Sequence, residues 1–249
     1  MTFLFVAGVE GAGHDMLRAL LKNVFEQPTF VLEGAWRKTL INYWDIRVRY
    51  NQEFGFFKRD TRTAARDTLQ TLVNQCQKEG ITHLFEDISY PFYQPRNSMR
   101  RTDLLDFTSL LPNDVQLKVL VLYRNPVSAT YSGIRRKFTK NVYEQARIVE
   151  DNLIYIDRHV TVGLNGNFRS LIFEDFLREP RAFLVGLADW LEVDELLLEK
   201  GLPNLREPFA AKDIPTKTRD ILTAFFTPER ARLWANLYAP AHQIRRNPN

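Results

Sequence analysis

Short apolar segments alternate along the chain with longer segments in which apolar residues recur every three or four positions. The apolar segments predict strands at residues 2–7, 29–32, 81–88, 117–123 and 169–173. The helical periodicity predicts helices at about 17–24, 59–79, 103–111, 126–136, 141–160, 180–191 and 217–237. This alternation of strands and helices is typical of a doubly wound α/β sheet with helices on both faces.

The segment 117–123 carries the clearest information about the type of sheet. It is nearly all apolar, which is typical of a strand covered on both faces, as in a parallel sheet. The chain shows no internal repeat, low-complexity tract or linker. Its 249 residues suit one large domain or two small ones, and we interpret residues 1–249 as a single domain.

The composition argues against several classes of protein. The net charge is +4, and basic clusters such as 135–137 are too short for a nucleic-acid-binding surface. Cys76 is the single cysteine, so neither an intrachain disulfide nor a cysteine-based metal site can form. No segment approaches the roughly 20 apolar residues of a membrane-spanning helix, and residues 1–7 lack the basic start of a signal peptide. We therefore expect a cytoplasmic protein with neither nucleic acid nor membrane as a partner.

A glycine-rich segment, residues 8–13, follows the first predicted strand and precedes the first predicted helix. In a doubly wound sheet, ligands bind beyond the carboxyl ends of the strands. Glycines there let the backbone approach an anion, and the start of the helix offers unpaired N–H groups. The segment lacks the Gly-Lys-Ser/Thr ending of ATP-binding loops, so a plain structural turn remains the alternative.

A second motif lies at the end of the segment 117–123. Arg124 follows this strand, Asn125 and Pro126 come next, and Ser132 lies eight residues after Arg124. A guanidinium and a hydroxyl at the start of a helix suit a phosphate group. The alternative is that Arg124 pairs with a nearby carboxylate and that the Ser132 hydroxyl bonds to its own helix.

The second motif resembles the 3′-phosphate-binding signature of sulfotransferases that use 3′-phosphoadenosine 5′-phosphosulfate (PAPS), with Arg124 and Ser132 at its two ligand positions. Residues 8–21 resemble the 5′-phosphosulfate loop and helix of that family, particularly in its tyrosylprotein and glycan branches. Residues 171–180 resemble its late strand, acidic pair and proline-started helix. The resemblance implies a P-loop NTPase-like α/β fold, PAPS as the donor and 3′-phosphoadenosine 5′-phosphate (PAP) as the product.

The phosphosulfate loop departs from the family pattern, which has a Lys or Arg followed by Ser-Gly-Thr-Thr. Here Gly11 stands at the basic position, Ala12 at the Ser, Gly13 at the Gly, and His14 and Asp15 at the two Thr. The resemblance implies that these residues hold the phosphosulfate. His14 is the expected substitute for the missing cation, since a bound anion favours its protonated form.

The resemblance also implies a general base that takes the proton of the acceptor. Glu33 falls close to the glutamate of the tyrosylprotein and glycan branches, at the end of the strand predicted at 29–32. Asp87 lies where the cytosolic branch has a catalytic lysine and is the second candidate. Lys212, followed by Lys217, is a candidate for a basic loop over the 3′-phosphate. No Asp, His and Glu residues have metal-ligand spacing, and the implied chemistry needs no metal.

These observations predict an enzyme that transfers the sulfuryl group of PAPS to a hydroxyl or amine of a small-molecule acceptor. One alternative is a non-catalytic homologue that binds PAPS or PAP, because the loop lacks its usual cation. Another is a small-molecule kinase of the P-loop type, which the missing Lys and Ser/Thr of the loop disfavour. The acceptor and the oligomeric state do not follow from the sequence.

Overall fold

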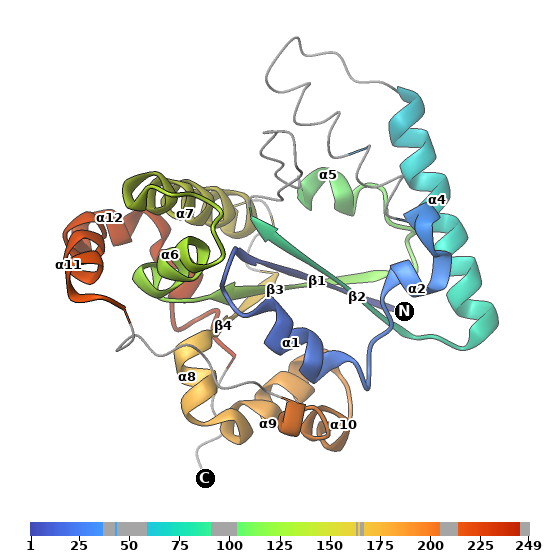
Figure 1. Ribbon diagram of the computed structural model, residues 1–249. Coiled ribbons are helices and arrows are strands. Elements are labelled where there is room, and N and C mark those ends of the chain that lie inside the picture. Colours follow the sequence, from blue (N-terminus) through green and yellow to red (C-terminus); the bar gives the residue numbers. More distant parts are fainter. Residues whose placement is uncertain are drawn as a thin grey trace. The chain divides into compact units, whose positions relative to one another are not determined.

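The computed structural model describes residues 1–36, 43, 59–90, 104–162, 164, 167–204 and 214–244. Four strands form one mainly parallel sheet in the order β2-β1-β3-β4 (Figure 1). The strands are β1 (Thr2–Val9), β2 (His83–Tyr90), β3 (Gln116–Tyr123) and β4 (Phe168–Ile172). The predicted α/β class with a mainly parallel sheet is confirmed.

The two central strands are apolar because both of their faces are covered. Every residue of β1 is buried, and so are residues 119–122 of β3. Strands β3 and β4 pair in parallel, with Val119 opposite Phe168 and Tyr123 opposite Ile172. The prediction of a buried parallel strand at 117–123 is therefore confirmed.

The described chain divides into two compact units. The first contains residues 1–5, 25–86 and 91–118, and the second contains residues 6–24, 87–90 and 119–249. Strands β1, β2 and β3 each contribute residues to both units, whereas β4 belongs to the second unit alone. The prediction of a single domain stays a prediction.

Most of the longer helices lie where the periodicity predicts them. The helices are α1 (His14–Leu21), α2 (Pro28–Leu32), α4 (Arg59–Glu79), α5 (Leu104–Thr108), α6 (Pro126–Arg135), α7 (Val142–Ile156), α8 (Phe173–Arg178), α9 (Pro180–Leu191), α10 (Glu195–Glu199), α11 (Thr216–Phe225) and α12 (Pro228–Ala231). Of these, α2, α8 and α10 are not among the predicted helices. A π-helix at Asp157–Val162 continues α7, and 3₁₀-helices lie at Leu202–Asn204 and Arg232–Tyr238. Within the second unit, α6 and α7 lie on one side of the strands and α1, α8 and α9 on the other (Figure 1).

Local capping explains where α6 begins, which matters for the site. The side chain of Asn125 accepts a hydrogen bond of 2.9 Å from the backbone N–H of Val127. Pro126 occupies the first turn, where a missing N–H has no cost. The Asn-Pro pair therefore ends the strand and starts the helix directly after Arg124.

Two predictions of secondary structure are wrong. Residues 29–32 form part of helix α2 and not a strand, because Pro28 stands in its first turn and favours a helical start. The helix predicted at 217–237 is interrupted after α11, because Thr227 and Pro228 cap and begin α12. Among the residues that the structure describes, no helix has both the length and the apolar composition of a membrane span.

Candidate functional site

Two glycines with positive φ turn the chain from β1 into α1. Gly13 is the N-cap of α1 with φ 110°, and Gly11 has φ 85°. A Cβ atom on Gly13 would collide with a ring carbon of Phe173. Side chains are strained at such φ values, so the loop needs glycine for both its conformation and its packing.

Gly11 packs directly against helix α6. A Cβ atom on Gly11 would lie 3.0 Å from the Cβ and 3.1 Å from the Oγ of Ser132, and 3.2 Å from the carbonyl oxygen of Ala129. The structure thus brings together Gly11 and Ser132, which the sequence assigned to the two ends of one nucleotide. A side chain at position 11 would be crowded by α6 and strained by the positive φ, which disfavours the family's basic residue there.

Arg124 reaches the same loop from the end of β3. Only 6% of its surface is exposed, and its Nη1 donates a hydrogen bond of 2.7 Å to the carbonyl oxygen of Gly11. The guanidinium also stacks over the ring of Phe173, with its carbon 4.5 Å from the ring centre. These contacts hold Arg124 in place beside Gly11 and Ser132.

The electrostatic surroundings of Arg124 include a carboxylate. Burial lowers the pKa of Arg124, the charge of Glu174 opposes this shift, and the nearby charge of Arg136 lowers the pKa further. Glu174 accepts a hydrogen bond of 3.0 Å from the backbone N–H of Asn125. Burial raises the pKa of the Glu174 carboxyl. Glu174 therefore supports the turn between β3 and α6.

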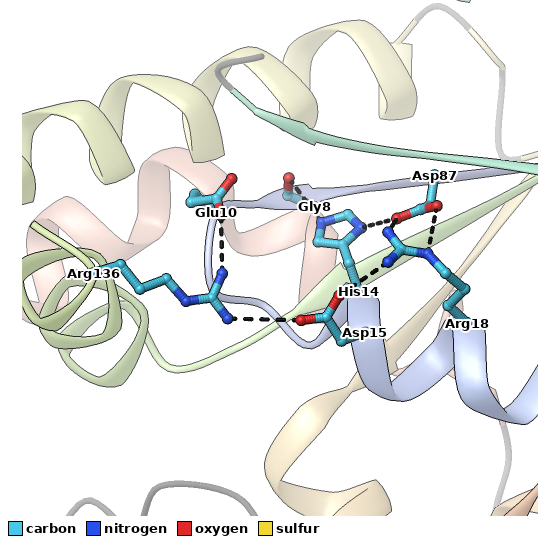
Figure 2. A network of polar contacts seen from close by, with 7 residues as sticks. All are labelled: Gly8, Glu10, His14, Asp15, Arg18, Asp87 and Arg136. Carbon is cyan, nitrogen blue, oxygen red and sulfur yellow. Dashed lines mark hydrogen bonds and ion pairs between the residues drawn. The ribbon is translucent and has the colours of Figure 1, made fainter. Parts of the chain in front are cut away.

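His14, the first residue of α1, is buried with 7% of its surface exposed. Its Nε2 lies 3.4 Å from the carbonyl oxygen of Gly8, and its Nδ1 lies 3.6 Å from Oδ2 of Asp87 (Figure 2). Both ring nitrogens thus face oxygen atoms, the Gly8 carbonyl on one side and the Asp87 carboxylate on the other. The cationic role that the resemblance implies for His14 stays a prediction.

Asp87, near the end of β2, is held by a cation that the sequence reasoning missed. Its two carboxylate oxygens accept hydrogen bonds of 2.6 Å and 3.3 Å from Arg18 of α1. Burial raises the pKa of Asp87, but the hydrogen bonds and charges of His14 and Arg18 outweigh it, so the pKa lies below its usual range. A carboxylate of lowered pKa is a weak base. Asp87 is therefore better suited to orient Arg18 and His14 than to accept a proton from a substrate.

Arg136 is a second functional candidate that the sequence reasoning missed. From the C-terminal end of α6 it crosses the loop, with Nη1 3.1 Å from Oε1 of Glu10 and Nη2 3.9 Å from Oδ2 of Asp15. Asp15 also contacts Arg18 at 3.0 Å. Oppositely charged side chains thus form a continuous network around the loop: Glu10, Arg136, Asp15, Arg18, Asp87 and His14 (Figure 2).

The remaining predicted residues fall in different places. Ala12 is buried, and its N–H donates to the carbonyl oxygen of Val9 at 3.0 Å within the turn. Glu33 is exposed and follows helix α2 with a φ of 51°, so it does not end a strand as predicted. It belongs to the first unit, whereas the other described candidates belong to the second.

Two further predictions concern residues outside this cluster. Lys212 lies outside the described residues, and Lys217 is exposed at the start of α11. Among the described residues, no group of three or more His, Cys, Asp or Glu side chains is placed to hold a metal ion.

The cluster in the second unit has the features of an anion site. The N-terminal end of α1 presents backbone N–H groups and a positive dipole end to the glycine loop. Arg124 and Arg136 add two positive charges, and Ser132 adds a hydroxyl. Such a set can bind two phosphate-like groups of one ligand.

The comparisons with known proteins identify the fold. No family model and no curated protein matches the chain. The sulfotransferase domain of the olefin synthase from Synechococcus PCC 7002 is 16% identical, with a TM-score of 0.53 over 96% of this chain and 95% of that one. A sulfotransferase from Alicyclobacillus acidocaldarius is 18% identical, with a TM-score of 0.53 over 94% and 95%. The chain therefore has the P-loop-like α/β fold of sulfotransferase domains.

Proposed function

We propose that this protein is a sulfotransferase that moves the sulfuryl group of PAPS to a hydroxyl or amine of a small-molecule acceptor. The observation that carries the proposal is the contact of Arg124 and Ser132 with Gly11. Arg124 donates to the carbonyl oxygen of Gly11, and Ser132 lies against its Cα. Gly11, Arg124 and Ser132 correspond to PAPS-binding positions of the family signature, and Arg124 and Ser132 both contact Gly11 on a sulfotransferase fold.

The proposed donor occupies the loop and the start of α6. Arg124 and Ser132 bind the 3′-phosphate, and residues 11–15 hold the 5′-phosphosulfate at the N-terminal end of α1. The acceptor atom donates an electron pair to sulfur, the bond from sulfur to the bridging phosphate oxygen breaks, and PAP leaves with that electron pair. Because negative charge grows on the leaving oxygen, N–H groups and cations of the loop favour the transition state.

We assign the general base to Glu33. The competing candidate Asp87 is committed to Arg18 and His14, and its pKa lies below the usual range. Glu33 is exposed, so an acceptor molecule can reach its carboxylate. It accepts the proton that the acceptor hydroxyl or amine loses when the new bond to sulfur forms.

A non-catalytic PAPS- or PAP-binding protein is the second candidate function. It is favoured by one observation: position 11, where the family has a Lys or Arg, is a glycine crowded by Ser132 and Ala129. The two candidates predict the same nucleotide binding and differ only in turnover.

Calorimetric titration with PAP tests the donor site. We expect micromolar binding of PAP, weaker binding of Mg·ATP, and binding of PAP to Arg124→Ala that is about 10- to 100-fold weaker, since a charge-assisted contact contributes about 1.5–3 kcal/mol. Arg147→Ala, a change at an exposed arginine of α7, is the matched control and should bind normally. Equal binding by Arg124→Ala, or tighter binding of Mg·ATP, would contradict the proposal.

Release of PAP from PAPS, measured with a panel of phenols, alcohols and amines, tests catalysis. In Glu33→Gln we expect turnover to fall by about 100-fold or more while PAP affinity stays unchanged, because a general base contributes about 10²–10⁴-fold. Glu26→Gln removes an exposed carboxylate just before α2 and serves as the control. Normal turnover in Glu33→Gln would exclude it as the base, and binding without turnover for every acceptor would favour the non-catalytic alternative.

A further inference from the structure

Arg136 crosses the glycine loop and pairs with one carboxylate on each side of it. Its Nη1 lies 3.1 Å from Glu10, just before Gly11, and its Nη2 lies 3.9 Å from Asp15, just after the N-cap of α1. The guanidinium therefore lies between the carboxylates at the two ends of the loop, next to the N-terminal end of α1 (Figure 2).

Two positive charges converge on this loop. Arg124 is buried against Gly11, and the charge of Arg136 is close enough to destabilise the charged form of Arg124. Like charges near a buried group are unfavourable, and an anion placed between them removes the repulsion. The charged forms of Arg124 and Arg136 are therefore more stable when an anion is bound beside them than when the loop is empty.

The carboxylates of the loop explain how Arg136 is held in the absence of an anion. Glu10 is mostly buried, and its negative charge beside the loop would repel a phosphate or sulfate group if it had no cation. Arg136 is 48% exposed, and its contact to Asp15 is long. A half-exposed arginine in such pairs can exchange one acceptor for another at small cost, because surface ion pairs contribute only about 0–1 kcal/mol.

We propose that Arg136 is a switchable ligand for the 5′-phosphosulfate: it pairs with Glu10 and Asp15 in the empty loop and moves to the donor when the donor binds. This inference rests on the proposed function and extends it. In the bound state the guanidinium supplies the cation that position 11 lacks. Because negative charge grows on the 5′-phosphate as sulfur leaves, the same contact favours the transfer itself.

The test measures which phosphate of the nucleotide depends on Arg136. PAP is titrated by calorimetry, and adenosine 5′-phosphate and adenosine 3′-phosphate are measured by displacement of PAP. In Arg136→Gln we expect affinity for PAP and adenosine 5′-phosphate to fall by about 10-fold, the effect of one charge-assisted contact, and affinity for adenosine 3′-phosphate to stay within about 2-fold. Arg135→Gln makes the same charge change at the adjacent exposed residue and should match the unmodified protein.

A second background separates direct binding from neutralisation of Glu10. If Arg136 only screens Glu10, then Arg136→Gln has no effect once Glu10→Gln has removed the negative charge. If Arg136 is a ligand, Arg136→Gln still weakens binding of PAP and adenosine 5′-phosphate by about 5- to 10-fold in the Glu10→Gln background. Thermal unfolding of each variant verifies that the affinities refer to folded protein.

Each failure points to a different cause. If PAP binds through Arg124 but Arg136→Gln binds normally, the inference is wrong and the proposed function stands. A loss confined to adenosine 3′-phosphate would place Arg136 at the other end of the nucleotide and overturn the assignment. If the unmodified protein binds none of the three nucleotides, both the inference and the proposed function are overturned.

Discussion

At the scale of single residues, the loop depends on glycines whose neighbours would crowd a side chain. Gly11 and Gly13 both have positive φ, and each faces a side chain of another element, Ser132 or Phe173. The sequence predicts an anion-binding loop from a glycine-rich segment between a strand and a helix, with a plain structural turn as the alternative. It could not predict the contact partners, because both partners lie more than 100 residues further along the chain.

Gly13→Ala should destabilise the protein more than an alanine at a glycine of similar conformation elsewhere. The positive φ costs about 1–2 kcal/mol, and the collision with the ring of Phe173 adds about 1–3 kcal/mol. Gly80→Ala is the matched control, since Gly80 has a φ of 70° and open space around its Cα. Urea unfolding should give a loss of about 1 kcal/mol for Gly80→Ala and about 3 kcal/mol for Gly13→Ala; equal losses would mean that Phe173 moves aside freely.

Asp87 makes the free energy of unfolding depend on acidity. Its pKa is lowered in the folded protein by His14 and Arg18, so its stabilising effect is present above the pKa of the unfolded chain and is lost as pH falls through the folded pKa. At pH 7 we expect Asp87→Asn to lower the free energy of unfolding by about 2 kcal/mol. The difference between Asp87→Asn and the unmodified protein should shrink below about pH 4.

Urea unfolding at pH 7 and at pH 3 measures this difference. Asp175→Asn breaks an exposed pair with Arg178 at 3.5 Å and should change stability by less than about 1 kcal/mol at either pH. A difference for Asp87→Asn that stays constant between the two pH values would show that the carboxyl has an ordinary pKa in the folded protein.

At the scale of elements, short-range signals placed most boundaries correctly. Pro126 and Asn125 mark the start of α6, and Gly80 with φ 70° marks the end of α4. At residues 29–32 the apolar run predicts a strand, but the segment after Pro28 is a helix. A run of four apolar residues has too little periodicity to separate the two, and the proline was the better guide.

The end of α6 contains a residue in an unfavourable conformation. Lys137 follows the helix with a φ of 62°, and its N–H donates to the carbonyl oxygen of Ile134 at 2.9 Å. Glycine adopts this conformation without strain, so Lys137→Gly should raise the free energy of unfolding by about 0.5–1 kcal/mol. Lys140→Gly, at an exposed lysine without a positive φ, should not stabilise. A loss of stability in Lys137→Gly would show that its side chain makes a contact that outweighs the strain.

At the scale of the whole molecule, the chain passes repeatedly between its two compact units. Strands β1, β2 and β3 each begin in one unit and end in the other. A strand cannot lose half of its length without weakening the other half, since neighbouring residues share the same ladder of hydrogen bonds. The two units are therefore expected to behave as the single domain that the sequence predicted.

Urea unfolding should accordingly show one cooperative transition. Far-UV circular dichroism and tryptophan fluorescence should give the same midpoint, because the fluorescence includes buried Trp36 of the first unit and buried Trp234 of the second. PAP at saturating concentration should shift both curves equally. Two separate midpoints, or a shift of one curve alone, would show that the units fold independently.

Apart from residues 29–32 and the break after α11, the sequence by itself determined the order of the elements that it predicted, the glycine loop between β1 and α1, and the place of Arg124 after β3. These features depend on neighbouring residues, such as apolar periodicity, glycine and proline, and so a local pattern is sufficient to reveal them.

Only the tertiary structure decided which charged residues meet at the loop. Arg18 pairs with Asp87 across 69 positions of the chain, and Arg136 pairs with Glu10 across 126. A charged residue in a helix has many possible partners, and the sequence pattern around Arg18 or Arg136 is the same whichever one it binds. The pairing is set by the packing of α1 and α6 beside the strands, which is a property of the folded chain as a whole.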